Sequence, residues 1–143
     1  MEIAEYQDKY AGQVIELWFK CKLVVPANNP RRDIARKRNV DPDLFLVGIK
    51  NGKVIASVMG GYDGHRGWIN YLAVDPVHRR RGHGRLIMQA VEKRLRAKGC
   101  PKINLQVRAT NDAVIKFYQA LGYSDDNVIG LGKRLVEDEP YFP

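Results

Sequence analysis

A short basic turn with two glycines is the part of this sequence whose residue types could do chemistry. It follows an apolar segment that ends at Pro76 and leads into a helical pattern. The N–H groups at a helix start carry partial positive charge and bind anions, and glycine lets an anion approach the backbone. Guanidinium groups add bidentate contacts with phosphate. The turn is therefore a predicted phosphate site, formed by Gly82 and Gly84 with Arg79, Arg80, Arg81 and Arg85.

The spacing of this turn excludes two well-known phosphate-binding loops. A Walker loop ends in Gly-Lys-Ser/Thr, whereas Gly84 is followed by Arg85 and Leu86. A dinucleotide fingerprint needs three spaced glycines directly after a strand and an acidic residue about 20 positions later. What does match is Arg79-x-x-Gly82-x-Gly84, which resembles the acetyl-CoA signature of the GNAT superfamily of N-acetyltransferases.

A second stretch strengthens this resemblance. Residues 111–123 read NDAVIKFYQALGY and follow the segment LQVR at 105–108. They resemble the closing strand, helix and tyrosine of the same superfamily, and are closest in pattern to the branch that acetylates the N-termini of ribosomal proteins. The joint resemblance covers roughly residues 44 to 136.

The resemblance implies a role for each matching residue. The pantetheine arm of acetyl-CoA would lie along residues 72–74, with the N–H groups of Ala73 and Val74 near the acetyl carbonyl. The N–H groups of residues 80–85 would hold the diphosphate, with His83 contributing only its backbone. Asn111 would contact a cofactor amide, and Tyr118 would protonate the departing thiolate. The expected cofactor contacts are Leu72, Ala73, Val74, Arg79, Arg80, Arg81, Gly82, His83, Gly84, Arg85, Asn111, Phe117 and Tyr118; no metal is expected.

Tyr118 also has an ordinary structural interpretation. It shares an apolar helix face with Val114, Phe117 and Leu121, where a core aromatic residue would fit. A phenol with a pKa of about 10 is nevertheless a feasible donor to a thiol with a pKa of about 8.5. Its place seven residues after Asn111 favours the catalytic role.

Gln106 departs from the ribosomal-protein branch, which carries a glutamate as general base at this position. An amide cannot take up a proton. Deprotonating a lysine amine at pH 7 costs about 4 kcal/mol of free energy, against about 1 kcal/mol for an α-amine. We therefore expect the acceptor to be an α-amine or another weakly basic amine. Its proton would leave through water, with Asn70, Asp63 and His65 as candidate helpers.

The net charge of +8 comes mainly from two clusters, and a basic protein of this kind could also have other functions. Half comes from the glycine turn, and half from residues 31–38, where Arg31, Arg32, Arg36, Lys37 and Arg38 oppose Asp33. The second cluster is either a solvated basic helix face or a selector of acidic acceptors. A nucleic-acid-binding protein would also be basic, but neither cluster carries the interleaved aromatic residues used for stacking. A non-catalytic acyl-CoA-binding domain, favoured by Gln106, is the other alternative.

Length and composition set the remaining limits. We expect residues 1–143 to form one domain, because the chain is long enough to bury about two thirds of its surface. No apolar run is long enough to cross a bilayer, and the N-terminus lacks a signal-peptide pattern. Cys21 and Cys100 have no metal-ligand spacing. We expect a cytoplasmic monomer or homodimer. Its acceptor would be a small-molecule amine or a protein N-terminus, and neither a membrane nor a nucleic acid is an expected partner.

The elements that must position these residues follow from the hydrophobic pattern. Strands are predicted at 2–6, 44–49, 54–62, 68–74, 102–107 and 128–136, with an Asn51-Gly52 hairpin turn. Helices are predicted after an Asp8 N-cap, at 31–38, at about 85–98 and at 111–121, before a loose acidic tail. This order predicts an α+β fold with helices on both faces of the sheet. The resemblance implies a mixed, mostly antiparallel sheet that splays between the strands ending at Val74 and Val107.

Overall fold

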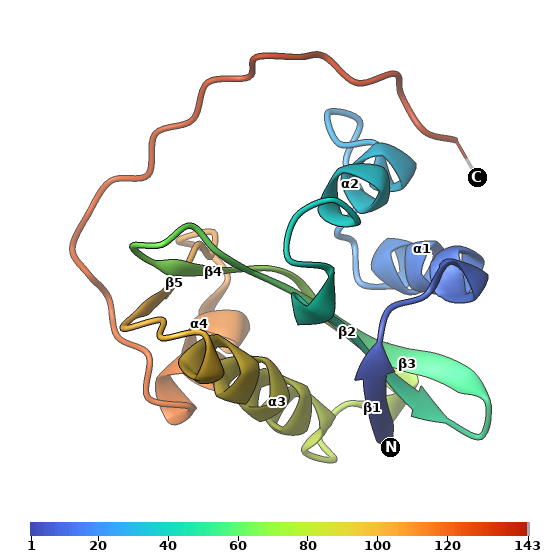
Figure 1. Ribbon diagram of the computed structural model, residues 1–143, viewed down its shortest axis with the longest axis horizontal. Coiled ribbons are helices and arrows are strands. Elements are labelled where there is room, and N and C mark those ends of the chain that lie inside the picture. Colours follow the sequence, from blue (N-terminus) through green and yellow to red (C-terminus); the bar gives the residue numbers. More distant parts are fainter. Residues whose placement is uncertain (143) are drawn as a thin grey trace.

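A five-stranded sheet organises the computed structural model, which describes residues 1–142 (Figure 1). Four neighbouring strands run antiparallel, and the fifth lies parallel to the fourth at one edge. The strands follow in the order β1 (Glu2–Glu5), β2 (Phe45–Lys50), β3 (Lys53–Tyr62), β4 (Gly67–Val74) and β5 (Ile103–Leu105). This arrangement confirms the predicted mixed, mostly antiparallel sheet.

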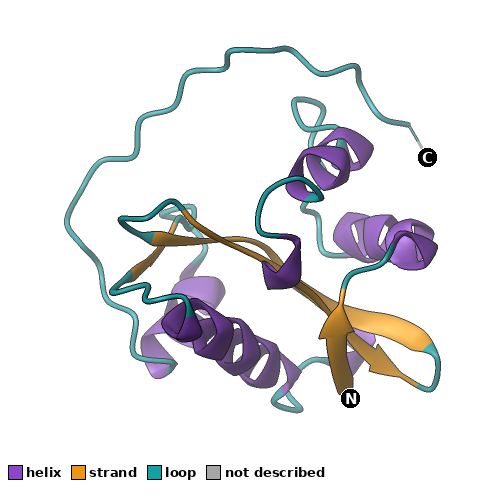
Figure 2. Cartoon of the chain, viewed as in Figure 1, coloured by secondary structure: helices purple, strands orange, loops and turns teal. Residues whose placement is uncertain are grey.

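Helices cover both faces of the sheet, as predicted (Figure 2). One pair packs on one face and the second pair on the other. In chain order they are α1 (Ala11–Lys20), α2 (Pro30–Lys37), α3 (His83–Ala97) and α4 (Asp112–Ala120), with short 3-10 turns at Asp8–Tyr10, Pro42–Leu44 and Pro76–His78. Within residues 1–142, no helix is long and apolar enough to span a bilayer.

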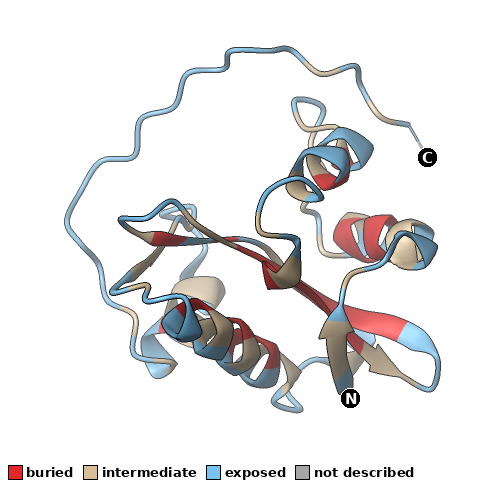
Figure 3. Cartoon of the chain, in the orientation of Figure 1, coloured by how far each residue is buried: buried red, intermediate tan, exposed pale blue. Residues whose placement is uncertain are grey.

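Two apolar cores result from this layering, one on each side of the sheet (Figure 3). Trp18 of α1 packs with Phe45 in the first core. Ile87, Val91 and Leu95 of α3 belong to the second core and are fully buried. Their spacing of four residues places them on one helix face, and burying side chains of this size contributes about 2 kcal/mol each.

The sheet opens between β4 and β5. Only residues 67–69 of β4 pair with residues 103–105 of β5, while β4 continues alone on this side to Val74. A bulge interrupts β4 beyond the paired part, because Ala73 pairs with Ser57 and Asn70 with Met59. Tyr71 and Leu72 therefore both stand opposite Val58. The predicted splay is confirmed, and β5 is shorter than the predicted strand 102–107 because the two strands separate after Leu105.

The predicted strand at 128–136 does not form. Residues 124–142 make an extended, largely exposed arc, and Ile129 and Leu131 are 87% and 91% exposed. A three-residue edge strand offers few hydrogen bonds to a further strand, and Gly130 and Gly132 weaken strand formation. The alternation of apolar residues was therefore a misleading signal in this segment.

Two predicted helix starts are displaced. Asp8 opens a 3-10 turn, and Tyr10 stands at the N-cap of α1 without a side-chain cap, so the predicted Asp8 cap is wrong. Helix α2 begins at Pro30, because the side-chain Oδ1 of Asn29 accepts hydrogen bonds from Arg31 N (3.0 Å) and Arg32 N (3.2 Å). Proline is well suited to the first helical position, where its missing N–H is not needed.

Candidate active site

The first turn of α3 has no side-chain cap. Its N-cap residue is Gly82, in the left-handed conformation with φ 82°, whereas Asn29 and Asn111 cap α2 and α4 with their side chains. An ideal Cβ on Gly82 would meet nothing within 4 Å, so the space in front of this turn is open. The first N–H groups of α3 therefore face a space where an anion can reach them.

The arginines of the turn have different surroundings. Arg80, Arg81 and Arg85 are exposed, and Arg80 has a positive φ of 63°. Arg79 points back to the strand, and its Nε donates to Val74 O at 3.2 Å. The turn thus keeps three guanidinium groups in solvent beside the α3 start and ties the fourth to the end of β4.

Asp75 anchors the connection between β4 and this turn. It is 3% exposed, accepts a hydrogen bond from Val77 N at 3.1 Å and lies 3.6 Å from Lys20 Nζ. Burial alone would raise the pKa of Asp75, but the Val77 N–H and the Lys20 charge outweigh it and lower the pKa below its usual value. A charged carboxylate therefore fixes the strand end from which the turn departs.

Three predicted site residues meet where β4, α3 and α4 converge. A Cβ added to Gly84 would lie 3.0 Å from Phe117 Cζ and 3.7 Å from Val74 Cγ2. Gly84 is therefore needed for the close approach of α4 to α3, rather than only for access of a ligand to the backbone. The sequence placed these residues at the same site but did not indicate this contact.

The backbone of Val74 faces the open edge of the sheet. Asp75 N donates to Ile55 O of β3 at 2.8 Å, and backbone groups alternate in direction along a strand. The polar groups of Ala73 therefore point toward β3 and those of Val74 point away from it. Cys21 Sγ approaches Val74 O at 3.3 Å from the end of α1, beside the Arg79 contact. The Val74 N–H points in the same direction as this carbonyl, into the splay.

Tyr118 is buried among aromatic side chains. It is 8% exposed, and its ring centroid lies 5.2 Å from that of Phe117 and 5.6 Å from that of Tyr123, both in edge-to-face geometry. Burial raises the pKa of Tyr118 to about 12, because the phenolate would be poorly solvated. Its phenol is therefore protonated at any physiological pH.

Tyr123 is fixed by Glu92 of α3 and supports Tyr118 from the side. Its hydroxyl donates to Glu92 Oε2 at 2.6 Å, and burial together with the carboxylate raises its pKa. The hydrogen bond holds the ring of Tyr123, and the aromatic contact holds the ring of Tyr118. Glu92 was not among the predicted residues, since no local motif connects it to Tyr123.

The other members of the second motif lie around the open edge. Asn111 caps α4, and its Oδ1 accepts Val114 N at 3.4 Å, which leaves its amide NH₂ group exposed. Gln106 is exposed just beyond β5, and the tail passes close to it: a Cβ on Gly130 would lie 2.9 Å from Gln106 Nε2. Leu72 packs on the core formed with α3 and α4.

The candidate proton acceptors do not gather at this place. Asp63 and His65 lie in the turn before Gly67, and Asp63 accepts backbone hydrogen bonds from His65 (2.8 Å) and Arg66 (2.7 Å). These bonds lower the pKa of Asp63. An eight-residue strand spans about 23 Å, so the turn lies far from Val74. Asn70 is exposed on β4 and is the one candidate beside the splay.

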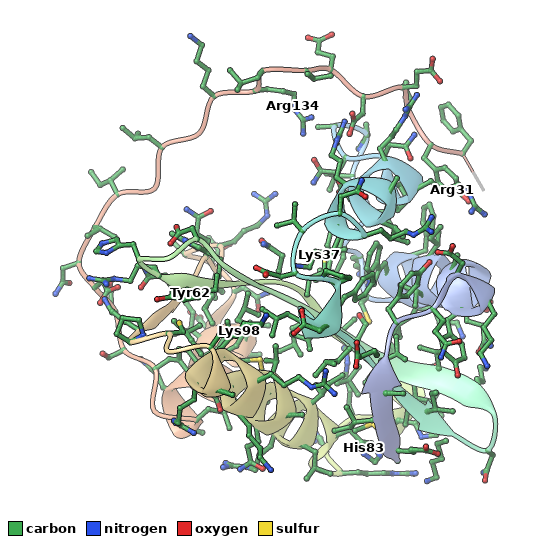
Figure 4. All side chains as sticks on the ribbon, in the orientation of Figure 1. Arg31, Lys37, Tyr62, His83, Lys98 and Arg134 are labelled. Atoms are coloured by element: carbon green, nitrogen blue, oxygen red, sulfur yellow. The ribbon has the colours of Figure 1, made fainter. Side chains whose placement is uncertain are left out.

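His83 lies close to the N-terminal end of β1 (Figure 4). Both of its ring nitrogens are buried without a hydrogen-bond partner within residues 1–142, and so is His78 Nδ1. Burial, aided by the nearby N-terminus and Lys50, lowers the pKa of His83. The ring is therefore neutral, in keeping with a contribution through the backbone alone.

The basic helix α2 contacts acidic groups of its own chain. Arg36 lies 2.5 Å from Asp138 of the tail, Arg38 lies 3.0 Å from Asp8, and Arg31 stands over the Tyr141 ring at 5.9 Å. Lys37 Nζ donates to Gly60 O, and burial lowers the Lys37 pKa. The end of the acidic tail is therefore docked on α2, in contrast to the loose tail expected from the sequence.

Known proteins are similar to this chain in sequence or in fold. The sequence model of the acetyltransferase (GNAT) family matches residues 11–123. The chain is 52% identical over 142 residues to acetyltransferase SG1711 of Sodalis glossinidius (strain morsitans), covering 99% of this chain and 100% of the relative. The ribosomal-protein-S18-alanine N-acetyltransferase from Escherichia coli has the same fold, with TM-score 0.72, 21% identity and coverage of 85% and 76%. So does AAC(6')-Iy in complex with the bisubstrate analogue CoA-S-monomethyl-acetylneamine, with TM-score 0.74, 19% identity and coverage of 93% and 97%. The family match and the relative's similarity along its whole length together show that this chain belongs to the GNAT family of acetyltransferases.

Proposed function

We propose that this chain transfers an acetyl group from acetyl-CoA to a primary amine within a ternary complex. The observation that carries the proposal is the uncapped start of α3 at the end of a strand whose edge is open. An uncapped helix start binds a diphosphate, and an open strand edge offers backbone groups to an extended arm. The two features are adjacent, as a ligand with both parts requires.

Residues of this chain would contact each part of such a ligand. The N–H groups of residues 83–85 and the exposed Arg80, Arg81 and Arg85 would hold the diphosphate. The arm would then run along β4 from Val74 toward Leu72, with the Val74 N–H offered to it. Phe117 would stand beside the arm, and the free amide NH₂ of Asn111 would be available to one of its carbonyls. The thioester would thereby lie near the bulge of β4.

The reaction needs a neutral amine, a polarised carbonyl and a proton for the leaving sulfur. Acetyl-CoA supplies the acetyl group as a thioester: the amine lone pair forms the new C–N bond, and the C–S bond breaks. Of the two N–H groups expected near the carbonyl oxygen, only that of Val74 points into the splay, and it would stabilise charge there; the N–H of Ala73 points toward β3. Tyr118 would give its proton to the sulfur and recover one, through solvent, from the nitrogen. A phenol of pKa about 12 is a weak acid, but the burial that raises it also disfavours a thiolate beside it.

We propose an α-amine or another weakly basic amine as the acceptor. Gln106 cannot accept a proton, so the acceptor must reach its neutral form through water at modest cost, about 1 kcal/mol for an α-amine at pH 7. The names of the two solved proteins above, an alanine N-acetyltransferase of a ribosomal protein and a complex with an acetylneamine analogue, support amine acceptors of these kinds. Among them, the resemblance of residues 105–123 to the ribosomal-protein branch favours a peptide α-amine.

Release of free thiol tests this proposal. The protein is incubated with acetyl-CoA and, in turn, an alanine-initiated peptide, an Nα-blocked lysine and an aminoglycoside. We expect turnover with the peptide and at least ten-fold slower turnover with lysine. Equal rates for peptide and lysine would contradict the acceptor class. Binding of CoA without thiol release from any amine would instead support the non-catalytic alternative.

A further inference from the structure

Tyr71 lies on the face of β4 opposite to the one that regular alternation would give. In a strand, residues two apart share a face. Ile69 belongs to the core under α3, whereas Tyr71 packs against the core under α1 and α2, and Leu72 returns to the α3 side. The bulge opposite Val58 causes this change, and Tyr71 has a φ of 51°, which is disfavoured for an aromatic residue.

Several contacts hold Tyr71 in this conformation. Its ring stacks on Trp18 with centroids 3.8 Å apart and an interplanar angle of 13°. Ser57 Oγ donates to Tyr71 O at 3.0 Å and accepts Trp18 Nε1 at 2.9 Å. A disfavoured backbone conformation that the surroundings maintain is common at functional sites.

The Tyr71 hydroxyl can act only as a hydrogen-bond acceptor toward a ligand. It donates its one proton to Asp33 Oδ2 at 2.5 Å, across a sequence separation of 38 residues. The oxygen keeps its lone pairs, so a group that binds there must supply an N–H or O–H. Burial and the Asp33 carboxylate raise the pKa of Tyr71, so the phenol remains protonated and this arrangement persists at working pH.

Asp33 determines this direction of the hydrogen bond and is itself held by neighbours. Its Oδ1 lies 3.4 Å from Arg36 Nη1, and Arg36 also binds Asp138 of the tail. These are the charged groups that face the pair from α2 and the tail, and Lys37 on α2 is occupied by Gly60 O. Because Asp33 has a side chain that is 25% exposed, the pair lies at the solvent side of the core.

We propose that the Tyr71 hydroxyl receives an N–H group of the acceptor amine, with Asp33 as the positioning residue that keeps the Tyr71 oxygen free to accept. The inference rests on the proposed function, in which the thioester ends near the bulge that carries Tyr71. A hydroxyl that only accepts hydrogen bonds makes the acceptor site selective for an amine whose nitrogen carries a hydrogen when it binds. The face concerned is the one toward α1 and α2, opposite to the α3 and α4 core in which Tyr118 lies.

Thiol release with an alanine-initiated peptide tests the inference. Tyr71→Phe removes only the oxygen and keeps the stacked ring, so we expect a loss of about ten-fold or more in kcat/KM for the peptide, with an unchanged KM for acetyl-CoA. Asp33→Ala should lose nearly as much, whereas Asp33→Asn retains an oxygen that can accept from Tyr71 and should recover part of the loss. The double variant Tyr71→Phe/Asp33→Ala should be no slower than Tyr71→Phe alone.

Two controls separate this role from a general structural one. Tyr62→Phe removes a hydroxyl that binds Gly64 O at 3.2 Å, and Asp43→Asn removes a carboxylate that binds Lys98 at 3.1 Å. Both should leave the peptide kinetics unchanged. If the wild type is active and Tyr71→Phe acetylates the peptide at the same rate, this inference alone is overturned. Additive losses in the double variant would overturn it as well. A wild type that binds CoA but acetylates none of the amines would overturn the proposed function, and this inference with it.

Discussion

Phe117 of α4 occupies the space that a side chain on Gly84 of α3 would need, because a Cβ there would lie 3.0 Å from Phe117 Cζ. This contact ties the start of α3 to the helix that carries Tyr118. The residue that would protonate sulfur is therefore placed relative to the turn that would hold the diphosphate. The close contact therefore couples the two positions.

Gly84→Ala should therefore destabilise the protein, although alanine is a better helix former than glycine. We expect the free energy of unfolding to fall by about 1–3 kcal/mol, the usual effect of overpacking. Gly12→Ala in α1 is the matched control, since nothing lies within 4 Å of its added Cβ. Urea denaturation should show a gain of up to about 1 kcal/mol for this control. A neutral or stabilising Gly84→Ala would show that the contact is not tight.

Tyr118→Phe should slow turnover without weakening the binding of acetyl-CoA, because only the transferable proton is lost. General acid catalysis contributes about 100-fold or more, so a decrease of this order in kcat is expected. Stopped thiol-release assays and calorimetry with CoA give the two quantities. A variant with the wild-type kcat would remove Tyr118 from the mechanism and leave it as a core residue.

Alkaline unfolding should also depend on Tyr118. Its pKa is about 12 in the folded chain against about 10 when unfolded, so the unfolded chain binds fewer protons between these values. Its contribution is fully present below pH 10 and is lost as pH rises toward 12, by up to about 2–3 kcal/mol. Tyr118→Phe should flatten the decline of stability with pH in this range, as measured by urea denaturation at pH 9 and pH 11. An equal decline of stability with pH in the wild type and in Tyr118→Phe would contradict the raised pKa of Tyr118.

The fold and the position of the basic glycine turn were largely predictable from the sequence because their signals are local. The Asn51-Gly52 turn, the helix over 83–97 and the basic glycine turn each lie within one continuous stretch of the chain. The Tyr71–Asp33 and Tyr123–Glu92 hydrogen bonds join residues 38 and 31 positions apart, and no spacing rule predicts such pairs. The bulge at Tyr71 could not be predicted from the sequence either, since it depends on the register of β4 with β3.

The strand predicted at 128–136 was wrong for the opposite reason. Its apolar alternation is a real local signal, but a strand needs a partner, and β5 pairs over only three residues. The tail is held at its far end, through Asp138 and through Glu139 O, which accepts Asn29 Nδ2 at 2.9 Å. The sequence could indicate opposite charges on α2 and the tail, but not that they meet.

Arg36→Ala should release the end of the tail with little effect on global stability. Arg36 is half exposed, and the Asp138 carboxylate, 3% exposed in the pair, returns to water when the tail is released. Limited trypsin digestion should then cut faster after Lys133 and Arg134, while the urea midpoint remains unchanged. Arg38→Ala is the matched control, since it breaks an exposed pair with Asp8 that does not involve the tail. Equal digestion of the two variants would indicate that the Arg36–Asp138 contact does not hold the tail.

The most direct test of the central claim is calorimetric titration of CoA into Gly82→Glu and Gly99→Glu. Both glycines have similar φ values, 82° and 84°, and neither Cβ would meet anything within 4 Å, so the two substitutions carry the same backbone strain and charge. If the uncapped start of α3 holds the diphosphate, Gly82→Glu should weaken CoA binding by roughly 100-fold or more, about 2.7 kcal/mol, while Gly99→Glu binds like the wild type. Equal affinities of the two variants would contradict the account.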